Sequence, residues 1–227
     1  QQRALAPDDH PQLVRLRYIA KRIIPYTTAW NKRAAQWKWE VILLGGAQIN
    51  AFCMPGGKIA FFWGILSKLQ LSDDEVAMIM GHEMAHALRE HARERMGKSF
   101  ATRGALEIGA ALFGLGDLGR MAAGTGEQLL SLTFSRSDES EADLVGMELA
   151  ARAGYNPAAG VTLWQKMGSA NKGAPPEFLS THPAGPTRIK DIEANLPKVQ
   201  PLYARAAKPQ RRFEPPAQPQ PTSAAQR

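Results

Sequence analysis

Residues 72–88 read SDDEVAMIMGHEMAHAL, and this stretch decides the fold. Ser72 followed three residues later by Glu75 is a capping box, in which each side chain satisfies a backbone N–H group at a helix start. The acidic residues of that first turn also lie at the positive end of the helix dipole. The stretch therefore predicts a helix that begins at Asp73 and continues to about Met96, just before a glycine.

The same helix carries the pattern His-Glu-x-x-His at residues 82–86. Four residues advance a helix by slightly more than one turn, so His82 and His86 lie on one face and can share a metal ion. Glu83 points about 100° away from His82 around the helix. It can therefore reach a water molecule on the metal without replacing a ligand.

A catalytic zinc site needs three protein ligands and one open position, so a third ligand is required. Cys53 is a candidate, but acidic residues on a second helix offer a better geometry. Glu139 and Asp143 are four residues apart and share a helix face. Gly146 could allow a close approach of that face. Glu141 points elsewhere and is the fallback, and the spacing leaves both Glu139 and Asp143 as candidates for the third ligand.

Around this centre the sequence predicts further helices and short strands. The strand-like runs are separated by Gly45-Gly46 and by Pro55-Gly56-Gly57, and they predict a small antiparallel sheet. Hydrophobic spacing and stop signals predict four more helices. The expected strands are 39–44, 49–53 and 58–62, and the expected helices are 11–24, 28–36, 127–153 and 186–192.

Length and composition favour one domain with a tail. A chain of 227 residues with 44% hydrophobic content can bury one substantial core, which we place at residues 1–200. Residues 201–227 are rich in Pro and Gln, carry +4 of the net charge of +7, and are expected to be disordered and dispensable for chemistry. The remaining charge forms no basic stripe with aromatic residues, so we expect no nucleic-acid partner.

Cys53 is the only cysteine, so an intramolecular disulfide is excluded. No stretch reaches the roughly 18 uninterrupted apolar residues that a membrane span needs. Residues 104–124 come nearest but contain charges, and they are expected to form a core hairpin or a flap over the site. The chain begins at Gln1 without a leader pattern, which we interpret as a processed start.

Several motifs in order resemble the HtpX and CAAX prenyl endopeptidase family of gluzincin zinc metallopeptidases, and especially its bacterial periplasmic quality-control branch. The resemblance spans roughly residues 50–188. It rests on the His-Glu-x-x-His helix and on four further motifs: Asn50-Ala51-Phe52 with Pro55-Gly56-Gly57, Glu139-x-x-Ala142-Asp143, Thr181-His182-Pro183, and Arg188-Ile189.

The resemblance implies an α+β, mainly helical zincin-like fold with the sheet at the edge of the active-site cleft. It implies that Glu139 is the third zinc ligand and that Asp143 hydrogen-bonds a ligand histidine. His182 and Arg188 would lie near the metal, where either could stabilise an oxyanion. In some relatives such a histidine fills the open zinc position. The edge strand at residues 50–52, comprising Asn50, Ala51 and Phe52, would pair with an extended substrate.

These expectations describe a zinc endopeptidase with one Zn²⁺ per chain, in which Glu83 accepts a proton from the attacking water and passes it to the leaving amine. The resemblance implies polypeptide substrates, namely misfolded or misassembled envelope proteins, a periplasmic or envelope location, and peripheral contact with membrane or outer-membrane proteins.

Two other functions remain open: a latent, chaperone-like zinc protein with little cleavage, and zinc-dependent hydrolysis of something other than peptide. His91 and His10 receive no function. His91 lies nine positions after His82, on a similar face but two and a half turns away, and we expect it to be a surface or loop-packing residue.

Overall fold

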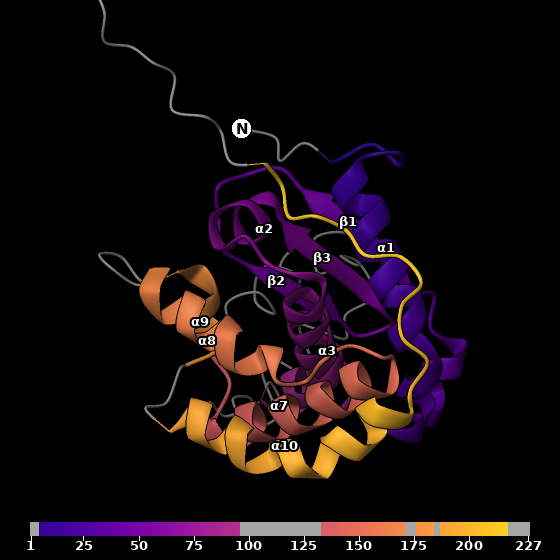
Figure 1. The fold of residues 1–227 in the computed structure, drawn as a ribbon, viewed down its shortest axis with the longest axis vertical. Coiled ribbons are helices and arrows are strands. Elements are labelled where there is room, and N and C mark those ends of the chain that lie inside the picture. The colour runs from indigo at the N-terminus through magenta and orange to yellow at the C-terminus, as the bar shows by residue number, and fades with distance from the viewer. Residues whose placement is uncertain (1–4, 96–132, 171–175, 184–186, 218–227) are drawn as a thin grey trace, which may run out of the picture.

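The structure is a computed structural model that describes residues 5–95, 133–170, 176–183 and 187–217. Helices dominate it, and one three-stranded sheet lies along one side (Figure 1). The elements in chain order are α1 (Pro11–Ile23), η1 (Ile24–Ala29), η2 (Lys32–Gln36), β1 (Glu40–Leu44), β2 (Ala51–Met54), β3 (Lys58–Phe62), α2 (Trp63–Leu69), α3 (Asp73–Leu88), α7 (Arg136–Arg152), α8 (Ala159–Ala170), α9 (Glu177–Thr181) and α10 (Arg188–Arg205).

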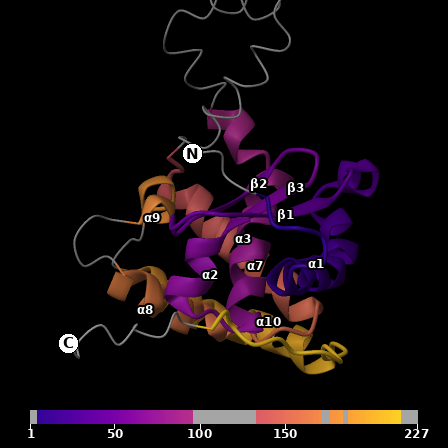
Figure 2. The same ribbon diagram turned by 90° about the horizontal axis from the view of Figure 1, so that it is seen from above.

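Helix α3 is the centre of the molecule. The capping box of Ser72 and Glu75 is present, which confirms the predicted start. Fifteen of the sixteen residues of α3 are buried, so the helix is covered on all sides rather than on one face. It lies between the sheet and α7, and α10 packs against the other side of α7 (Figures 1 and 2).

Two glycines set how closely α3 and α7 approach. A Cβ atom added to Gly146 of α7 would lie 2.6 Å from the backbone nitrogen of His82, and one added to Gly81 would lie 2.6 Å from the Gly146 carbonyl oxygen. Both distances are well inside van der Waals contact. The backbones therefore touch where the two helices carry their metal-ligating candidates.

The sheet has the strand order β1-β3-β2 and is mixed, so the prediction of an antiparallel sheet is wrong for one pair. Strands β2 and β3 are antiparallel around a turn in which Gly56 and Gly57 have positive φ, whereas β1 and β3 are parallel. The segment after β1 is longer than a tight hairpin turn, which allows β1 and β2 to lie on opposite sides of β3. Strand β2 is thus an edge strand.

Three helix boundaries differ from the prediction. Residues 24–36 form two 3₁₀ helices rather than one α-helix from residue 28. Helix α3 ends at Leu88, because Glu90 adopts a left-handed conformation with φ of 57° although it is not glycine. Helix α7 begins only at Arg136, after a second capping box at Ser135. The part of the predicted helix at residues 127–132 lies outside the described residues.

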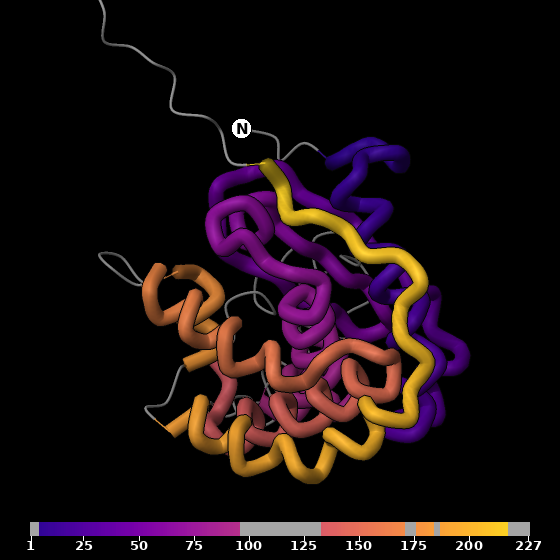
Figure 3. The backbone as a smooth tube through the Cα atoms, in the orientation of Figure 1, coloured from indigo at the N-terminus to yellow at the C-terminus, as the bar shows by residue number. Residues whose placement is uncertain are grey.

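The predicted disordered tail is also wrong as far as residue 217. Helix α10 continues through Arg205, past the expected end at residue 192 and past Pro197 and Pro201. Residues 206–217, which we call the C-terminal strap, then run in an extended conformation along α1 (Figure 3). Residues 218–227 lie outside the described part of the chain.

Backbone contacts hold the C-terminal strap in place. The Phe213 N–H donates to Asp73 Oδ2 at 2.9 Å, and the Phe213 ring lies 5.5 Å from that of Tyr18. Side-chain amides of Gln12 and Gln70 donate to strap carbonyls at 3.0 and 2.9 Å. The proline-rich composition predicted disorder because such side chains form no core. Hydrogen bonds to its backbone order the extended strap without a core of its own.

Among the described residues, no helix has the length and apolar composition to cross a membrane. The segment at residues 104–124, expected as a hairpin or flap, lies outside the described residues.

Candidate metal centre

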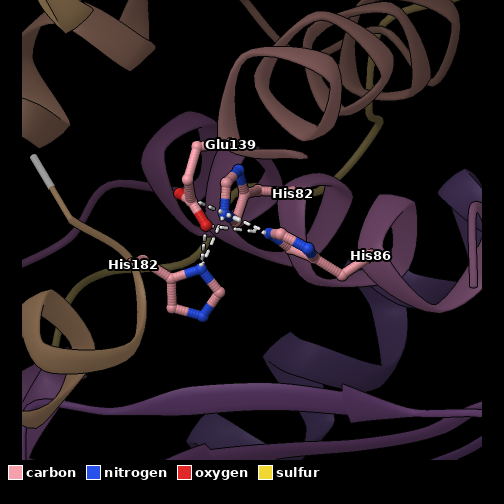
Figure 4. Close-up of side chains that lie close together, drawn as sticks. All are labelled: His82, His86, Glu139 and His182. Atoms are coloured by element: carbon pink, nitrogen blue, oxygen red, sulfur yellow. Dashed lines mark hydrogen bonds and ion pairs between the residues drawn. The ribbon is translucent and has the colours of Figure 1, made fainter. Parts of the chain in front are cut away.

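Four side chains converge at the centre of the molecule (Figure 4). His82 and His86 come from α3, Glu139 comes from α7, and His182 follows α9. All four are buried, with exposed fractions of 3–4%. One ligand atom from each lies within 4.8 Å of the others.

The spacing of these atoms fits a tetrahedral zinc ion. Zinc bonds of about 2.0–2.1 Å place tetrahedral ligand atoms roughly 3.3–3.4 Å apart. The His82 and His86 Nε2 atoms are 3.1 Å apart, and they lie 3.5 and 3.3 Å from the Glu139 carboxylate. Two imidazoles and a carboxylate are ligands that zinc prefers. The three predicted ligands are therefore brought together in the expected geometry.

His182 stands at the fourth corner of this group. Its Nδ1 atom lies 3.2 Å from His82 Nε2 and 2.9 Å from Glu139 Oε1. Its other nitrogen, Nε2, lies 3.4 Å from Glu83 Oε1. The ring is held between Phe178 and Phe134, which stack on it at 4.5 and 5.2 Å between centroids.

Asp143 and Arg188 form hydrogen bonds with the metal-ligating candidates. Asp143 Oδ1 lies 2.9 Å from His82 Nδ1, and Arg188 binds Asp143 at 2.7 Å and Glu139 at 2.6 Å. The Arg188 guanidinium donates from Nε and Nη2 to Asp143, and from Nη1 to Glu139 and the Pro183 carbonyl. It also lies 3.6 Å over the Trp164 ring. This geometry suits Arg188 to orienting the two carboxylates. It suits the expected role, contact with an oxyanion, less well.

The charges of the site favour a cation at its centre. Burial opposes ionisation of Glu139, but His82 and the hydrogen bond from His182 outweigh it and lower the pKa of Glu139. Burial likewise opposes ionisation of Asp143, but Arg188 outweighs it and lowers that pKa. Burial lowers the pKa of His86 well below its usual range, which leaves a neutral ring with a lone pair for a metal.

Glu83 lies beside the cluster without belonging to it. Its carboxylate is buried, and Oε1 forms no hydrogen bond with the described residues. Burial raises the pKa of Glu83, and the neighbouring His182 partly offsets this. A buried carboxylate oxygen without a hydrogen-bonding partner, next to a metal centre and facing a cleft, is placed as a general base requires.

The cleft in front of Glu83 has β2 as one wall. Asn50, Ala51 and Phe52 line it, as predicted, and Cys53 and Met54 continue the wall. The opposite side comprises Glu83, His86, Phe134 and His182. Cys53 is not among the grouped ligand atoms, and burial raises the pKa of its thiol, which disfavours the thiolate that a metal binds.

Sequence reasoning missed His91. Because α3 ends at Leu88, His91 turns back, and its Nδ1 lies 3.0 Å from Nδ1 of His86. Its Nε2 lies 2.9 Å from Glu141, the fallback ligand, whose other oxygen pairs with Arg89 at 2.7 Å. Of the two expected roles, surface residue and loop-packing residue, the first is therefore wrong, because only 2% of His91 is exposed. A third histidine five residues after His86 was the available signal.

Phe134 was missed as well. Its ring lies 3.9 Å from that of His86 and stacks on His182, so it touches both sides of the cluster. Its N–H donates to the Thr181 carbonyl at 3.0 Å, which ties the start of α7 to the segment that carries His182. An isolated phenylalanine outside any motif gave no signal.

A helical domain with a His-Glu-x-x-His helix, a glutamate from a second helix and a small sheet bounding the cleft defines a zincin-like metallopeptidase of the gluzincin type. The comparison with known families agrees: the model of peptidase family M48 matches residues 15–196. The chain belongs to peptidase family M48, whose members use zinc.

Curated relatives come from eukaryotes and bacteria. The mitochondrial metalloendopeptidase OMA1 of Arabidopsis thaliana is 40% identical over 161 residues, 70% of this chain and 32% of that protein. OMA1 of Schizosaccharomyces pombe is 34% identical over 199 residues, 86% of this chain and 56% of that protein. The beta-barrel assembly-enhancing protease of Escherichia coli is 26% identical over 181 residues, 74% of this chain and 37% of that protein.

The chain thus spans between about a third and three fifths of the length of these relatives.

Proposed function

We propose that this chain is a zinc-dependent endopeptidase that hydrolyses peptide bonds within extended polypeptides. One observation carries the proposal. The buried ligand set His82, His86 and Glu139 lies beside Glu83, whose Oε1 forms no hydrogen bond with the described residues, in a cleft that has an edge strand as one wall. Metal ligands, base and substrate strand are the three parts that metal-assisted peptide hydrolysis needs.

Each ligand histidine presents Nε2 to the metal position, and Asp143 fixes the ring of His82 through Nδ1. Bound zinc supplies Lewis acidity, which polarises a carbonyl and lowers the pKa of water towards about 7. Glu83 Oε1 then accepts a proton from the attacking water and later donates it to the leaving amine. Its desolvated position favours this exchange, because a raised pKa makes the carboxylate a better proton acceptor.

The cleft supports an extended polypeptide as substrate. Strand β2 uses one side to pair with β3 and has no strand partner on its other side among the described residues. A polypeptide in extended conformation can add to such an edge through main-chain hydrogen bonds. We propose that Asn50, Ala51 and Phe52 bind the substrate backbone, and that the apolar side chains of Phe52, Met54 and Phe134 select apolar substrate residues.

We place the substrates among misfolded or misassembled proteins of the bacterial envelope, with a periplasmic or envelope-associated location. The sequence motifs resemble the periplasmic branch of the family, and one relative is named for beta-barrel assembly. Peripheral contact with membrane or outer-membrane proteins would follow from such substrates. Because other relatives are mitochondrial, the same chemistry also serves a second compartment.

The position of His182 favours a second candidate, a latent zinc protein with little cleavage. Its Nδ1 fills the corner that an attacking water would need, 3.2 Å from His82 Nε2. We propose that this geometry is a closed state, and that His182 leaves the corner when substrate enters. In the open state its Nε2, now near Glu83, could instead stabilise an oxyanion.

Cleavage of casein by the zinc-loaded protein, followed by mass spectrometry of the products, tests the proposal. An endopeptidase produces internal fragments, stops when zinc is chelated, and recovers when zinc is returned. A latent binder holds stoichiometric zinc without producing fragments.

The variant His182→Ala separates the two roles of His182. If this histidine mainly closes the site, the variant cleaves faster than the wild type; if it mainly stabilises the oxyanion, the variant cleaves more slowly. Equal rates would contradict both roles.

A further inference from the structure

His91 contacts a metal-ligating candidate but is not itself in the ligand group. We infer that His91 is a positioning residue that, together with Glu141, fixes the tautomer and ring orientation of His86. This inference rests on the proposed function, because it assumes that His86 Nε2 binds the metal.

Arg89 pairs with Glu141 Oε1 at 2.7 Å, and a carboxylate oxygen of Glu141 can only accept a hydrogen bond. His91 Nε2, 2.9 Å from Glu141 Oε2, must therefore carry a proton. In a neutral imidazole with a proton on Nε2, Nδ1 is an acceptor. The surface carboxylate thus determines which nitrogen of His91 accepts.

The tautomer of His91 in turn determines that of His86, the metal-ligating candidate. His91 Nδ1 lies 3.0 Å from His86 Nδ1, and since the first is an acceptor, the second must donate. The proton of His86 is then held on Nδ1, which leaves the Nε2 lone pair free. That nitrogen is the atom in the cluster, 3.3 Å from Glu139 Oε1. Every N–H and lone pair along this chain has a partner of the right kind.

The two ligand histidines are supported differently. His82 has a carboxylate, Asp143, directly at its Nδ1. His86 instead has the imidazole of His91 at its Nδ1, and the carboxylate of Glu141 lies on the far side of that ring. His86 therefore receives its orientation from a neutral group, which adds no negative charge beside a site that already holds Glu139 and Asp143. This arrangement supplies tautomer control without a third carboxylate in the buried cluster.

The fold is arranged to make this contact. In a continuous helix His91 would point away from His86, since five residues advance the helix by about 500°. The left-handed conformation of Glu90 ends α3 and returns His91 to His86. Only 2% of the His91 surface is exposed, so water does not compete for the bond. A left-handed glutamate costs energy that a glycine would not, and the contact offsets it.

A purely structural tie between the end of α3 and α7 would use the same contacts, so the test must separate the two roles. Zinc affinity, measured by competition with a chromophoric chelator, does so when apo-protein thermal stability is measured in parallel. His91→Leu removes the acceptor and leaves the His86 N–H unpaired. His91→Asn keeps an acceptor, because the amide oxygen can occupy the position of Nδ1.

We expect His91→Leu to bind zinc about 10–100-fold more weakly than the wild type, and His91→Asn to recover most of this loss. Cobalt-substituted His91→Leu should also show an altered visible spectrum. Wild-type affinity in His91→Leu would overturn the inference. So would equal losses in both variants, which indicate packing alone.

A second pair of variants covers the case in which His91→Leu does not fold. Glu141 is 40% exposed, and Glu141→Ala should weaken zinc binding several-fold while leaving stoichiometric zinc at high concentration. The matched control is Glu148→Ala on the same helix, which loses an ion pair with Arg152 and should not change zinc affinity. Identical affinities of the two variants would overturn the inference. Failure of the proposed function is distinguished by the wild type, which would then bind zinc without cleaving casein.

Discussion

At the scale of single residues, hydrogen-bond partners determine which nitrogen of each site histidine carries the proton and how each carboxylate is oriented. Asp143 and His91 face the outer nitrogens of the two ligand histidines, and Arg188 binds both Asp143 and Glu139. The positions of His82 and His86 were predictable because helix geometry fixes the His-Glu-x-x-His spacing, whereas the choice of Glu139 came from the family resemblance. The position of His91 was not, because it depends on a helix end that no glycine marks.

The assignment of the third ligand makes a direct prediction. Glu139→Ala removes a ligand atom from the cluster and should weaken zinc binding by at least about 100-fold, so that zinc is lost on gel filtration. Glu141→Ala should retain stoichiometric zinc under the same conditions, because the ionic partners of Glu141 among the described residues are Arg89 and His91, neither of which is in the ligand group. Metal analysis by mass spectrometry measures both. Loss of zinc from Glu141→Ala with retention in Glu139→Ala would reverse the assignment.

At the scale of elements, the close crossing of α3 and α7 positions the site. Start signals at Ser72 and Ser135 are local, and the first was recognised from sequence. The strand order could not be read in the same way. Whether β1 pairs parallel or antiparallel with β3 depends on how the segment at residues 45–50 crosses, which local patterns do not encode. The close approach at Gly146 was expected from the sequence, but its partner on α3, Gly81, was not.

Gly146→Ala tests the importance of that crossing. The added methyl group would lie 2.6 Å from the His82 backbone nitrogen, so the helices must separate. We expect a loss of about 1–3 kcal/mol in unfolding free energy. Zinc affinity should fall as well, because His82 and Glu139 lie on opposite sides of the crossing.

The control is Gly168→Ala in α8, where an added Cβ meets no atom within 4 Å. This variant should gain up to about 1 kcal/mol from helix propensity and keep wild-type zinc affinity. Chemical denaturation and chelator competition measure both effects. Equal behaviour of the two variants would show that the crossing does not control the site.

At the scale of the whole molecule, the C-terminal strap links the chain end to the start of the metal-bearing helix. Besides the Phe213 bond to Asp73, Arg212 pairs with Asp74 at 2.9 Å. Composition alone predicted disorder here, since prolines and glutamines form no core. The contacts that order the segment come from α1, from Gln70 at the end of α2 and from α3, more than a hundred residues away in sequence, and no local pattern reveals them.

Truncation after Arg205 should lower stability, because it removes five hydrogen bonds between strap backbone groups and side chains of Gln12, Tyr18, Arg22, Gln70 and Asp73, and one ion pair. At about 0.5–1.5 kcal/mol for each hydrogen bond, the loss is roughly 3–7 kcal/mol, and the partly exposed ion pair adds little to it. At about 2–4 °C per kcal/mol, the corresponding decrease in Tm is at least about 5 °C. Turnover per bound zinc at low temperature should be retained, as the strap does not line the cleft.

Truncation after Ala217 removes none of these contacts and serves as the control. Thermal unfolding of the two truncated proteins and the full chain gives the comparison. An unchanged Tm after removal of residues 206–227 would mean that the C-terminal strap does not stabilise the fold.

The central claim is that zinc held by His82, His86 and Glu139 acts together with Glu83 on a peptide bond. Its most direct test is casein cleavage by the wild type and Glu83→Gln at equal zinc content. We predict that both proteins bind one zinc per chain and that the variant cleaves at least about 100-fold more slowly, because the amide cannot accept the proton. Equal cleavage by the two zinc-loaded proteins would contradict the account.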